Sequence, residues 1–318
     1  MMDCTDRHCR RLMRFISAKA RLYTEMVTAQ ALAHARDPQR FLAHDPAEYP
    51  LALQVGGSDP GLLANAARMA AAAGFQEINL NVGCPSDRVT SGRFGACLMA
   101  EPDLVRVCVA AMADAVDIPV TVKTRIGIDD REDDAILDTL VDVVAAAGCR
   151  TVIVHARRAI LSGLSPKENR EIPPLKYDRV ARLKLRRPDL TIVLNGGLTS
   201  LDACERHLGE VDGVMLGRAA YERPYEVLSQ VDTRLFGAET APPSETDVVC
   251  AYLDYAQAMC AAGVRRSAVL RHMVGLFRGR PGARAWRQVL SAANRSDFSW
   301  RAVHSTAEHI GCAEPLAA

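Results

Sequence analysis

The stretch Glu77-Ile78-Asn79-Leu80-Asn81-Val82-Gly83-Cys84-Pro85 indicates more about this chain than any other segment. Its first six residues read as a short buried strand, which Gly83 and Pro85 bring to an end. A thiol placed where a strand ends lies at the rim of a parallel sheet or barrel, where α/β enzymes hold their reacting groups. Cys84 is therefore a candidate for chemistry, although a free cysteine is also often only a compact buried hydrophobe.

Six other short, β-rich runs accompany this strand. The predicted strands are residues 22–27, 51–55, 77–82, 120–125, 151–155, 191–195 and 213–216. Between them lie helix-like segments rich in Ala and Leu, at residues 60–73, 102–116, 133–147, 176–185 and 200–208. Asp59 and Pro60 are typical of a helix start, and Gly74 and Gly148 of helix ends. The alternation predicts βα units around a parallel sheet.

The strand count predicts an α/β fold of the TIM (β/α)8 barrel type from which the first strand is missing. Seven strands are found where a closed barrel needs eight, and Met1-Met2-Asp3-Cys4-Thr5 reads as the loop after a strand. Residues 1–236 are expected to form this barrel. Residues 236–244, rich in Gly, Pro, Ser and Thr, read as a linker, and residues 245–318 as a small all-α domain.

Composition and charge restrict the class of protein. The 318 residues carry a net charge of +1, so the molecule as a whole does not attract polyanions. Residues 261–301 nevertheless hold nine arginines, no lysine and one acid, Asp297, which favours a phosphate-rich partner over a solvated surface of mixed charge. The ten cysteines show no spacing suited to zinc. We expect no metal site, no signal peptide, no membrane span and a reducing cytoplasmic setting.

Polar and glycine residues at the ends of several strands predict a cofactor site. Two strands end in glycine, at Asn195-Gly196-Gly197 and at Gly217-Arg218, and such turns in the last two strands of a barrel commonly bind a phosphate. Gln54, Lys123 and His155 end three other strands and could surround a planar ring. Taken singly, each is explained equally well as a capping Gln, a snorkelling Lys or a core His.

The loop at residues 161–174 is long for a connection between a strand and a helix, and long loops in compact domains are often functional. Lys167, Asn169 and Arg170 within it could grip phosphates or bases. The alternative is a solvated surface loop.

Several motifs together resemble those of the tRNA-dihydrouridine synthases. The similar segments are Met1-Met2-Asp3, Thr5-Asp6-Arg7-His8, Tyr23-Thr24-Glu25-Met26, Leu53-Gln54-Val55-Gly56-Gly57, Asn79-Leu80-Asn81-Val82-Gly83-Cys84-Pro85-Ser86, Val122-Lys123-Thr124-Arg125, His155-Ala156-Arg157 and Asn195-Gly196-Gly197. The segments Leu164-Ser165-Pro166-Lys167-Glu168-Asn169-Arg170 and His272-Met273-Val274-Gly275-Leu276-Phe277 resemble the A-type branch of that family. The resemblance covers nearly the whole chain in order.

This resemblance implies an FMN-binding TIM barrel followed by a helical tRNA-binding domain. NADPH would reduce the flavin, which would pass hydride to C6 of a D-loop uridine at positions 20 and 20a, and Cys84 would protonate C5. The FMN positions implied by the resemblance are Met1, Met2, Gln54, Lys123, His155, Asn195, Gly196, Gly197, Gly217 and Arg218. The implied tRNA-binding residues are Asn81, beside the uridine, and Lys167, Asn169, Arg170, Arg284 and Arg287. We expect a monomer.

Two departures from the family pattern leave alternatives open. Relatives have a strand ending in Pro before Met-Met-Asp, and they usually carry Trp and Tyr where this chain has Cys4 and Cys9. Either the start is misassigned, which we favour, or the copy is truncated and binds FMN poorly. The competing functions are a small-molecule FMN-barrel dehydrogenase and an inactive RNA-binding relic. Cys97 is the rival acid, which we interpret as packing or pocket lining.

Overall fold

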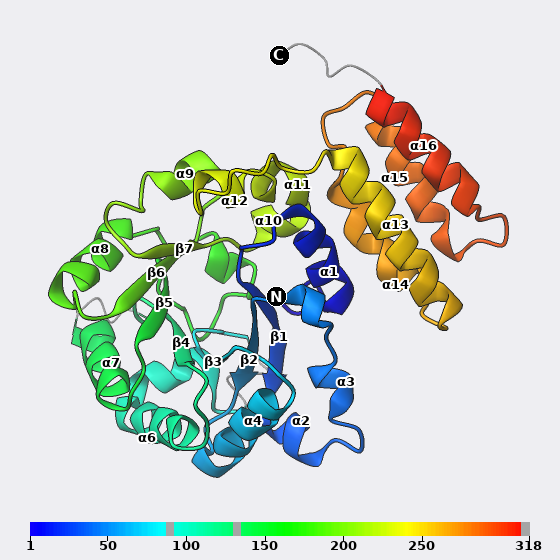
Figure 1. Ribbon diagram of the computed structural model, residues 1–318. Helices are drawn as coiled ribbons and strands as arrows, with labels where there is room; N and C mark the ends of the chain where they lie inside the picture. Colours follow the sequence, from blue (N-terminus) through cyan, green and yellow to red (C-terminus); the bar gives the residue numbers. More distant parts are fainter. Residues whose placement is uncertain (87–91, 130–134, 313–318) are drawn as a thin grey trace.

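The strands form one curved parallel sheet, in a computed structural model that describes residues 1–86, 92–129 and 135–312. The sheet follows chain order from β1 to β7, and every neighbouring pair is parallel. Its strands are β1 (Leu22–Thr28), β2 (Leu51–Gly56), β3 (Glu77–Val82), β4 (Val120–Arg125), β5 (Thr151–His155), β6 (Thr191–Asn195) and β7 (Gly213–Met215). This arrangement confirms the seven predicted strands and their TIM-barrel-like order, with β1 and β7 at the two edges of the sheet (Figure 1).

Helices cover the outer side of the sheet, as the alternation predicts (Figure 1). They are α4 (Pro60–Ala72), α6 (Pro102–Ala113), α7 (Ala135–Ala146), α8 (Tyr177–Arg186) and α9 (Leu201–Glu205). Helix α4 begins where expected, because the Asp59 carboxylate accepts a hydrogen bond from the N–H of Leu62 at 2.8 Å and Pro60 occupies the first turn. The first two residues of the predicted helix at 133–147 lie outside the described residues.

The core lies between this sheet and its helices. Every residue of β3 is buried, including Glu77 and the two asparagines, as suits a strand of a parallel sheet covered on both faces. Apolar side chains of β3 alternate with polar ones, so one face packs against helices while the other carries polar groups into the interior of the barrel.

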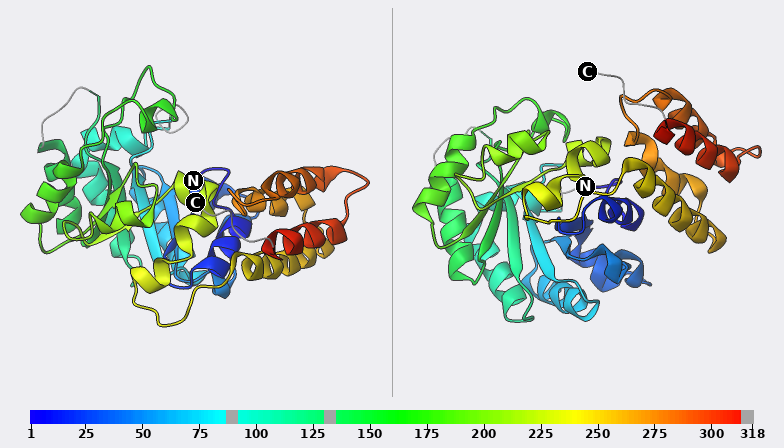
Figure 2. Two further views of the ribbon diagram at one scale, coloured as in Figure 1. Left: turned by 90° about the horizontal axis from the view of Figure 1, so that it is seen from above. Right: turned by 45° about the horizontal axis from the view of Figure 1, so that its top comes forward.

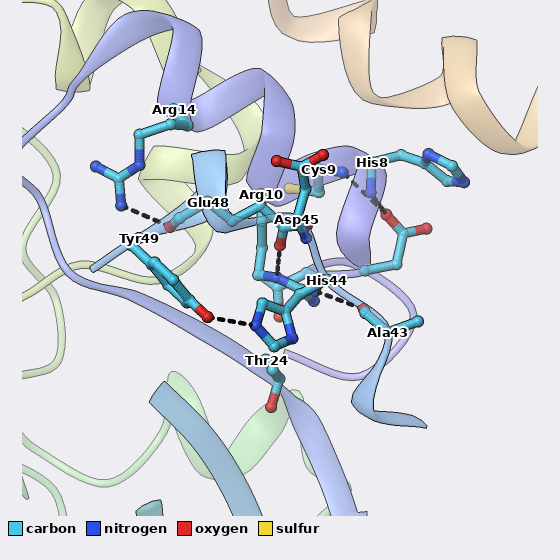
Figure 3. A network of polar contacts seen from close by, with 12 residues as sticks. His8, Cys9, Arg10, Arg14, Thr24, Ala43, His44, Asp45, Glu48 and Tyr49 are labelled. Carbon is cyan, nitrogen blue, oxygen red and sulfur yellow. Dashed lines mark hydrogen bonds and ion pairs between the residues drawn. The ribbon is translucent and has the colours of Figure 1, made fainter. Parts of the chain in front are cut away.

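An N-terminal helix that the strand-and-helix pattern did not predict lies beside the edge strand β1 (Figure 1). Helix α1 (Arg7–Ile16) is held to the short helix η1 (Pro46–Glu48) by a buried ion pair, with Arg10 Nε 2.6 Å from Glu48 Oε2 (Figure 3). The guanidinium of Arg14 adds hydrogen bonds to the carbonyl oxygens of Glu48 and Pro50. Other short helices are α2 (Ala29–His34), α3 (Gln39–Leu42), η2 (Gly95–Ala100), η3 (Glu168–Arg170), α10 (Arg218–Glu222), α11 (Pro224–Leu228) and α12 (Val231–Arg234).

The C-terminal part is helical, as the sequence predicts, and stands to one side of the sheet (Figure 2). It contains α13 (Glu245–Ala261), α14 (Arg266–Leu270), η4 (Arg271–Gly275), α15 (Ala283–Ser291), η5 (Ala292–Asn294) and α16 (Trp300–Cys312) around fully buried Tyr252, Phe277 and Trp286. No helix or strand lies at residues 236–244, where the linker is predicted. The division into two domains at that point stays a prediction.

Polar contacts join these helices to α1. The Asp6 carboxylate, which caps α1, lies 2.6 Å from Arg271 Nη2 and 2.9 Å from His272 Nε2. The ring of His8 meets the hydroxyl of Tyr255 at 2.7 Å. The N-terminal helix therefore links the barrel to the helical region. Nowhere in the described part of the chain is a helix both long enough and apolar enough to span a bilayer.

Candidate active site

The register of the sheet brings the predicted strand-end residues to one edge. Gln54 pairs with Asn79, Asn81 with Lys123, and His155 with Asn195 across successive strands. Because the carboxyl ends of parallel strands meet on the same side of a barrel, these side chains gather at its mouth. The cofactor site is predicted from the sequence at this same position.

Cys84 follows β3 in a tight turn held by a neighbouring amide. Asn81 Oδ1 accepts hydrogen bonds from the N–H groups of Gly83 at 3.0 Å and Cys84 at 2.9 Å. The Cys84 side chain is half-buried, and its Sγ lies 3.5 Å from Ser86 Oγ. The turn therefore presents a partly accessible thiol at the rim. The next residues, 87–91, lie outside the described part.

A group of cations surrounds the mouth beside this thiol. Burial, with a smaller contribution from Arg125, lowers the pKa of Lys123 to about 8. Burial, followed by the charges of Arg125 and Lys123, holds the pKa of His155 far below its ordinary value, so its ring is neutral. Among the described residues, the side-chain ammonium of Lys123 makes no hydrogen bond or ion pair with another side chain or carbonyl oxygen, and His155 Nδ1 is buried without a hydrogen-bond partner. The mouth is therefore suited to an anionic ligand with hydrogen-bonding groups.

Arg125 ties the Cys84 turn to the long loop after β5, a role that the sequence analysis missed. Its Nε donates to the carbonyl oxygen of Gly83 at 3.0 Å, and its Nη1 donates to that of Asn169 at 3.0 Å. It is 5% exposed, and burial lowers its pKa to about 10. Its position two residues after Lys123 on the same strand face was the only signal available in the sequence.

The two glycine turns, at the ends of β6 and β7, differ in how strictly their backbone conformation requires glycine. Gly196 and Gly197 have φ values of 109° and 69°, and a Cβ atom on Gly197 would overlap the side chains of Leu175 and Tyr177. Gly217 opens α10 with a negative φ and lies beside the side chain of Met1. The turn after β6 thus requires glycine for its own backbone and packing, whatever it binds.

The other predicted FMN positions lie around this end of the sheet in different degrees of exposure. Asn195 is buried, and its Nδ2 donates to the carbonyl oxygen of Met215 at 2.7 Å, which links β6 to β7. Arg218 is exposed and pairs with Glu171 at 2.7 Å. Met2 is 52% exposed.

The residues predicted to bind tRNA fall into two sets. Lys167 and Arg170 are exposed on the loop after β5, whereas the Asn169 amide is fully buried. Asn169 Oδ1 accepts from the N–H of Ile160 at 2.7 Å and its Nδ2 donates to the Ile160 carbonyl at 2.9 Å, so its side chain shapes the loop from within. A direct contact of Asn169 with tRNA stays a prediction that this geometry does not favour.

The second set lies on the arginine-rich helices. Arg284 and Arg287 are exposed, three residues apart on α15, and pair with no described carboxylate. Other arginines of the block are neutralised within the protein, since Arg271 pairs with Asp6 and Arg295 with Asp297. Fewer arginines therefore contribute to the positively charged surface than the nine counted in residues 261–301.

Cys97 differs from Cys84 in its surroundings. Its Sγ donates to the carbonyl oxygen of Phe94 at 3.1 Å, and burial raises the pKa of its thiol. This placement agrees with packing or lining of the site. No group of His, Cys, Asp and Glu side chains that could hold a metal ion occurs within the described ranges.

Comparison with known proteins gives a family match over almost the whole chain. The family model described as dihydrouridine synthase (Dus) matches residues 1–308. A tRNA-dihydrouridine(20/20a) synthase of Shewanella oneidensis is 56% identical over 291 residues, which are 92% of this chain and 86% of the relative. The protein of the same name from Xanthomonas campestris pv. campestris is 54% identical over 309 residues, 97% of this chain and 91% of the relative.

Among solved structures, a histamine dehydrogenase from Rhizobium sp. 4-9 aligns with a TM-score of 0.49 and 15% identity, over 70% of this chain and 42% of that one. This likeness is too weak to support an argument.

Proposed function

Because the chain belongs to the dihydrouridine synthase family, we propose that it reduces uridine to 5,6-dihydrouridine in tRNA, with FMN as cofactor and NADPH as reductant. Relatives more than 50% identical bear the name tRNA-dihydrouridine(20/20a) synthase, which supports uridines 20 and 20a as the targets. Because tRNA is its proposed substrate, we infer that the protein acts in the cytoplasm. The observation that carries the proposal is the half-buried thiol of Cys84 at the mouth, in the turn that follows β3, the strand paired with the one that carries Lys123.

The residues at the mouth fit FMN. The ammonium of Lys123, which pairs with no described side chain, suits a ring that gains negative charge on reduction. The buried Nδ1 of His155 lacks a hydrogen-bond partner that a polar ligand would supply. The Gln54 amide uses one donor and one acceptor within the protein, which leaves it a second of each. When bound, FMN supplies the hydride that C6 of the uracil receives.

Cys84 would complete the reduction by giving its proton to C5. The carbon–carbon double bond of the uracil then becomes a single bond, and the thiolate that remains recovers a proton from solvent. A positioned thiol can act as a general acid in this way. The hydrogen bonds from Gly83 and Cys84 to Asn81 fix the backbone that carries the sulfur.

Exposed cations would hold the tRNA while the target base leaves its stack. Unstacking costs a few kcal/mol, and phosphate contacts by Arg284, Arg287, Lys167 and Arg170 would offset it. Replacing Arg284 and Arg287 with Ala should lower tRNA affinity and reduce the slope of log affinity against log salt by about 1 for each arginine. An unchanged slope would contradict this assignment. It would favour a small-molecule substrate, which free uridine or a related pyrimidine would then reveal.

The central experiment combines Cys84→Ala with Cys97→Ala as the matched control. Each purified variant is incubated with NADPH and unmodified tRNA, dihydrouridine is mapped by mass, and flavin is measured by absorbance. We expect Cys84→Ala to lose at least about 100-fold in rate, as removal of a general acid does, while keeping its flavin. Cys97→Ala should stay within a few-fold of the parent. Normal turnover by Cys84→Ala would refute the assignment.

A further inference from the structure

A continuous ladder of side-chain hydrogen bonds runs through the barrel interior to the Cys84 turn. It begins at the Glu77 carboxylate, which accepts from Thr121 Oγ1 at 2.7 Å. Thr121 Oγ1 accepts from Asn79 Nδ2 at 2.8 Å, and Asn79 Oδ1 accepts from Gln54 Nε2 at 2.9 Å. Gln54 Oε1 accepts from Asn81 Nδ2 at 3.0 Å, and Asn81 Oδ1 holds the turn. We call these five side chains the amide ladder.

In every hydrogen bond of the amide ladder, the donor lies on the side of the Cys84 turn and the acceptor lies on the side of Glu77. A carboxylate only accepts, so Glu77 fixes the Thr121 hydroxyl as a donor, and the oxygen of that hydroxyl is then left to accept from Asn79. A backbone N–H only donates, so at the other end Asn81 must turn its oxygen toward Gly83 and Cys84. The two ends therefore impose the same orientation on all the amides between them.

The ladder is buried and anchored at its far end. Glu77, Asn79 and Thr121 are 5%, 0% and 2% exposed. The carboxylate also accepts from the Tyr23 hydroxyl at 2.7 Å and pairs with Arg21 at 3.0 Å. Buried polar groups cost free energy unless every partner is satisfied, and aliphatic side chains would fill the same space without that requirement. Packing alone therefore does not account for this set of residues.

We propose that Glu77, Thr121 and Asn79 are positioning residues, which set the orientation of the Gln54 and Asn81 amides and so fix the Cys84 thiol. The amide orientation rests on geometry alone, and its consequence for turnover rests on the proposed function. Loss of the Thr121 hydroxyl leaves Asn79 Nδ2 without its acceptor and frees that amide to rotate. Rotation would bring two NH₂ groups together at Gln54, and Asn81 would then lose its fixed orientation toward the turn.

Thr121→Val tests this role, because it removes the hydroxyl and keeps the shape of the side chain. Thr121→Ser restores the hydroxyl and is the rescue variant. Thr151→Val is the matched control, because Thr151 precedes Val152 on β5 just as Thr121 precedes the paired Val122 on β4. The full chain is used for each, and hydrogen exchange of the Gly83 and Cys84 amides, alkylation of Cys84, flavin content, kcat and KM for tRNA are measured.

We expect Thr121→Val to speed exchange at both amides by about five-fold, the factor that loss of a typical net hydrogen bond produces. The alkylation rate of Cys84 should change. The value of kcat, expressed per bound flavin because Gln54 belongs both to the ladder and to the proposed FMN site, should fall by at least a similar factor while KM for tRNA stays constant. Thr121→Ser and Thr151→Val should behave as the parent. Glu77→Gln removes the carboxylate that makes the Thr121 hydroxyl a donor, so it should also speed amide exchange and lower kcat. It replaces Thr121→Val as the test if that variant does not fold.

Unchanged amide exchange in both Thr121→Val and Glu77→Gln would overturn the proposal, and so would a Thr121→Ser variant as impaired as Thr121→Val. The exchange and alkylation measurements need neither tRNA nor turnover. If the parent protein forms no dihydrouridine, these two measurements still decide whether the ladder positions the turn, so its failure is distinguishable from failure of the proposed function.

Discussion

Replacing Lys123 with methionine tests the electrostatics of the barrel mouth in the flavin-free protein. The pKa of this lysine falls from 10.5 in the unfolded chain to about 8 in the fold. The unfolded chain therefore binds the proton more tightly, so the charge of Lys123 opposes folding below about pH 8, and the penalty fades as pH rises toward the unfolded value. Methionine fills similar space without a charge.

The magnitude follows from the size of the pKa shift. At 1.36 kcal/mol for each pH unit, the penalty reaches up to about 3 kcal/mol near pH 7 and falls to about 1 kcal/mol near pH 10. This is an upper value, because Lys123 keeps some contact with water. Lys123→Met should therefore be more stable than the parent protein by a larger margin near pH 7 than near pH 10. The difference between the two margins should be up to about 2 kcal/mol in the free energy of unfolding.

Urea denaturation at the two pH values measures this difference directly. Lys167→Met, on an exposed loop, controls for the added methionine, and comparison with the parent removes the contribution of other titrating groups. If the free energies of unfolding of Lys123→Met and the parent differ by the same amount at both pH values, the lowered pKa is wrong. Flavin binding should weaken in Lys123→Met even though the flavin-free fold becomes more stable.

Three other substitutions test contacts between segments that lie far apart in the sequence. Arg125→Met should destabilise the fold by at least about 2 kcal/mol in urea and speed proteolysis of residues 161–174, because buried carbonyl groups lose a charged donor. Arg10→Met should lower the free energy of unfolding in urea by about 3–5 kcal/mol, because it leaves the Glu48 carboxylate buried without its partner. A loss of only about 1 kcal/mol or less, as for an ion pair on the surface, would contradict this. Gly275→Ala should cost about 1–3 kcal/mol in thermal unfolding, because the added methyl group would overlap the carbonyl oxygen of Glu222 and push η4 from the barrel.

The strands and the strand-end residues could be predicted because they depend on local patterns. Apolar runs between turn residues locate β3 and β4, and parallel pairing then brings Asn81 and Lys123 together at one edge without further information. The bounds differ by only a few residues, as where α6 ends at Ala113 and not at residue 116.

Contacts between distant parts of the chain could not be predicted in this way. Arg125 reads as the end of a strand, and only the fold shows that its partners lie 42 and 44 residues away. Helix α1 has a pattern interrupted by many arginines, and the burial of Arg10 depends on a glutamate 38 residues later. Asn169 looks exposed in a polar loop, yet its amide satisfies the backbone from inside. In each case a polar side chain serves the protein's own backbone, and a single sequence does not reveal such partners.

The grip of Arg125 on two carbonyl oxygens has a mechanical consequence. One guanidinium donates hydrogen bonds both to the turn that bears Cys84 and to the loop that carries the exposed Lys167 and Arg170. A ligand that shifts this loop would therefore disturb the hydrogen bond to Gly83 as well, because both bonds come from the same planar group. Under the proposed function, binding of the RNA at the loop and placement of the Cys84 thiol would then depend on each other through this one side chain.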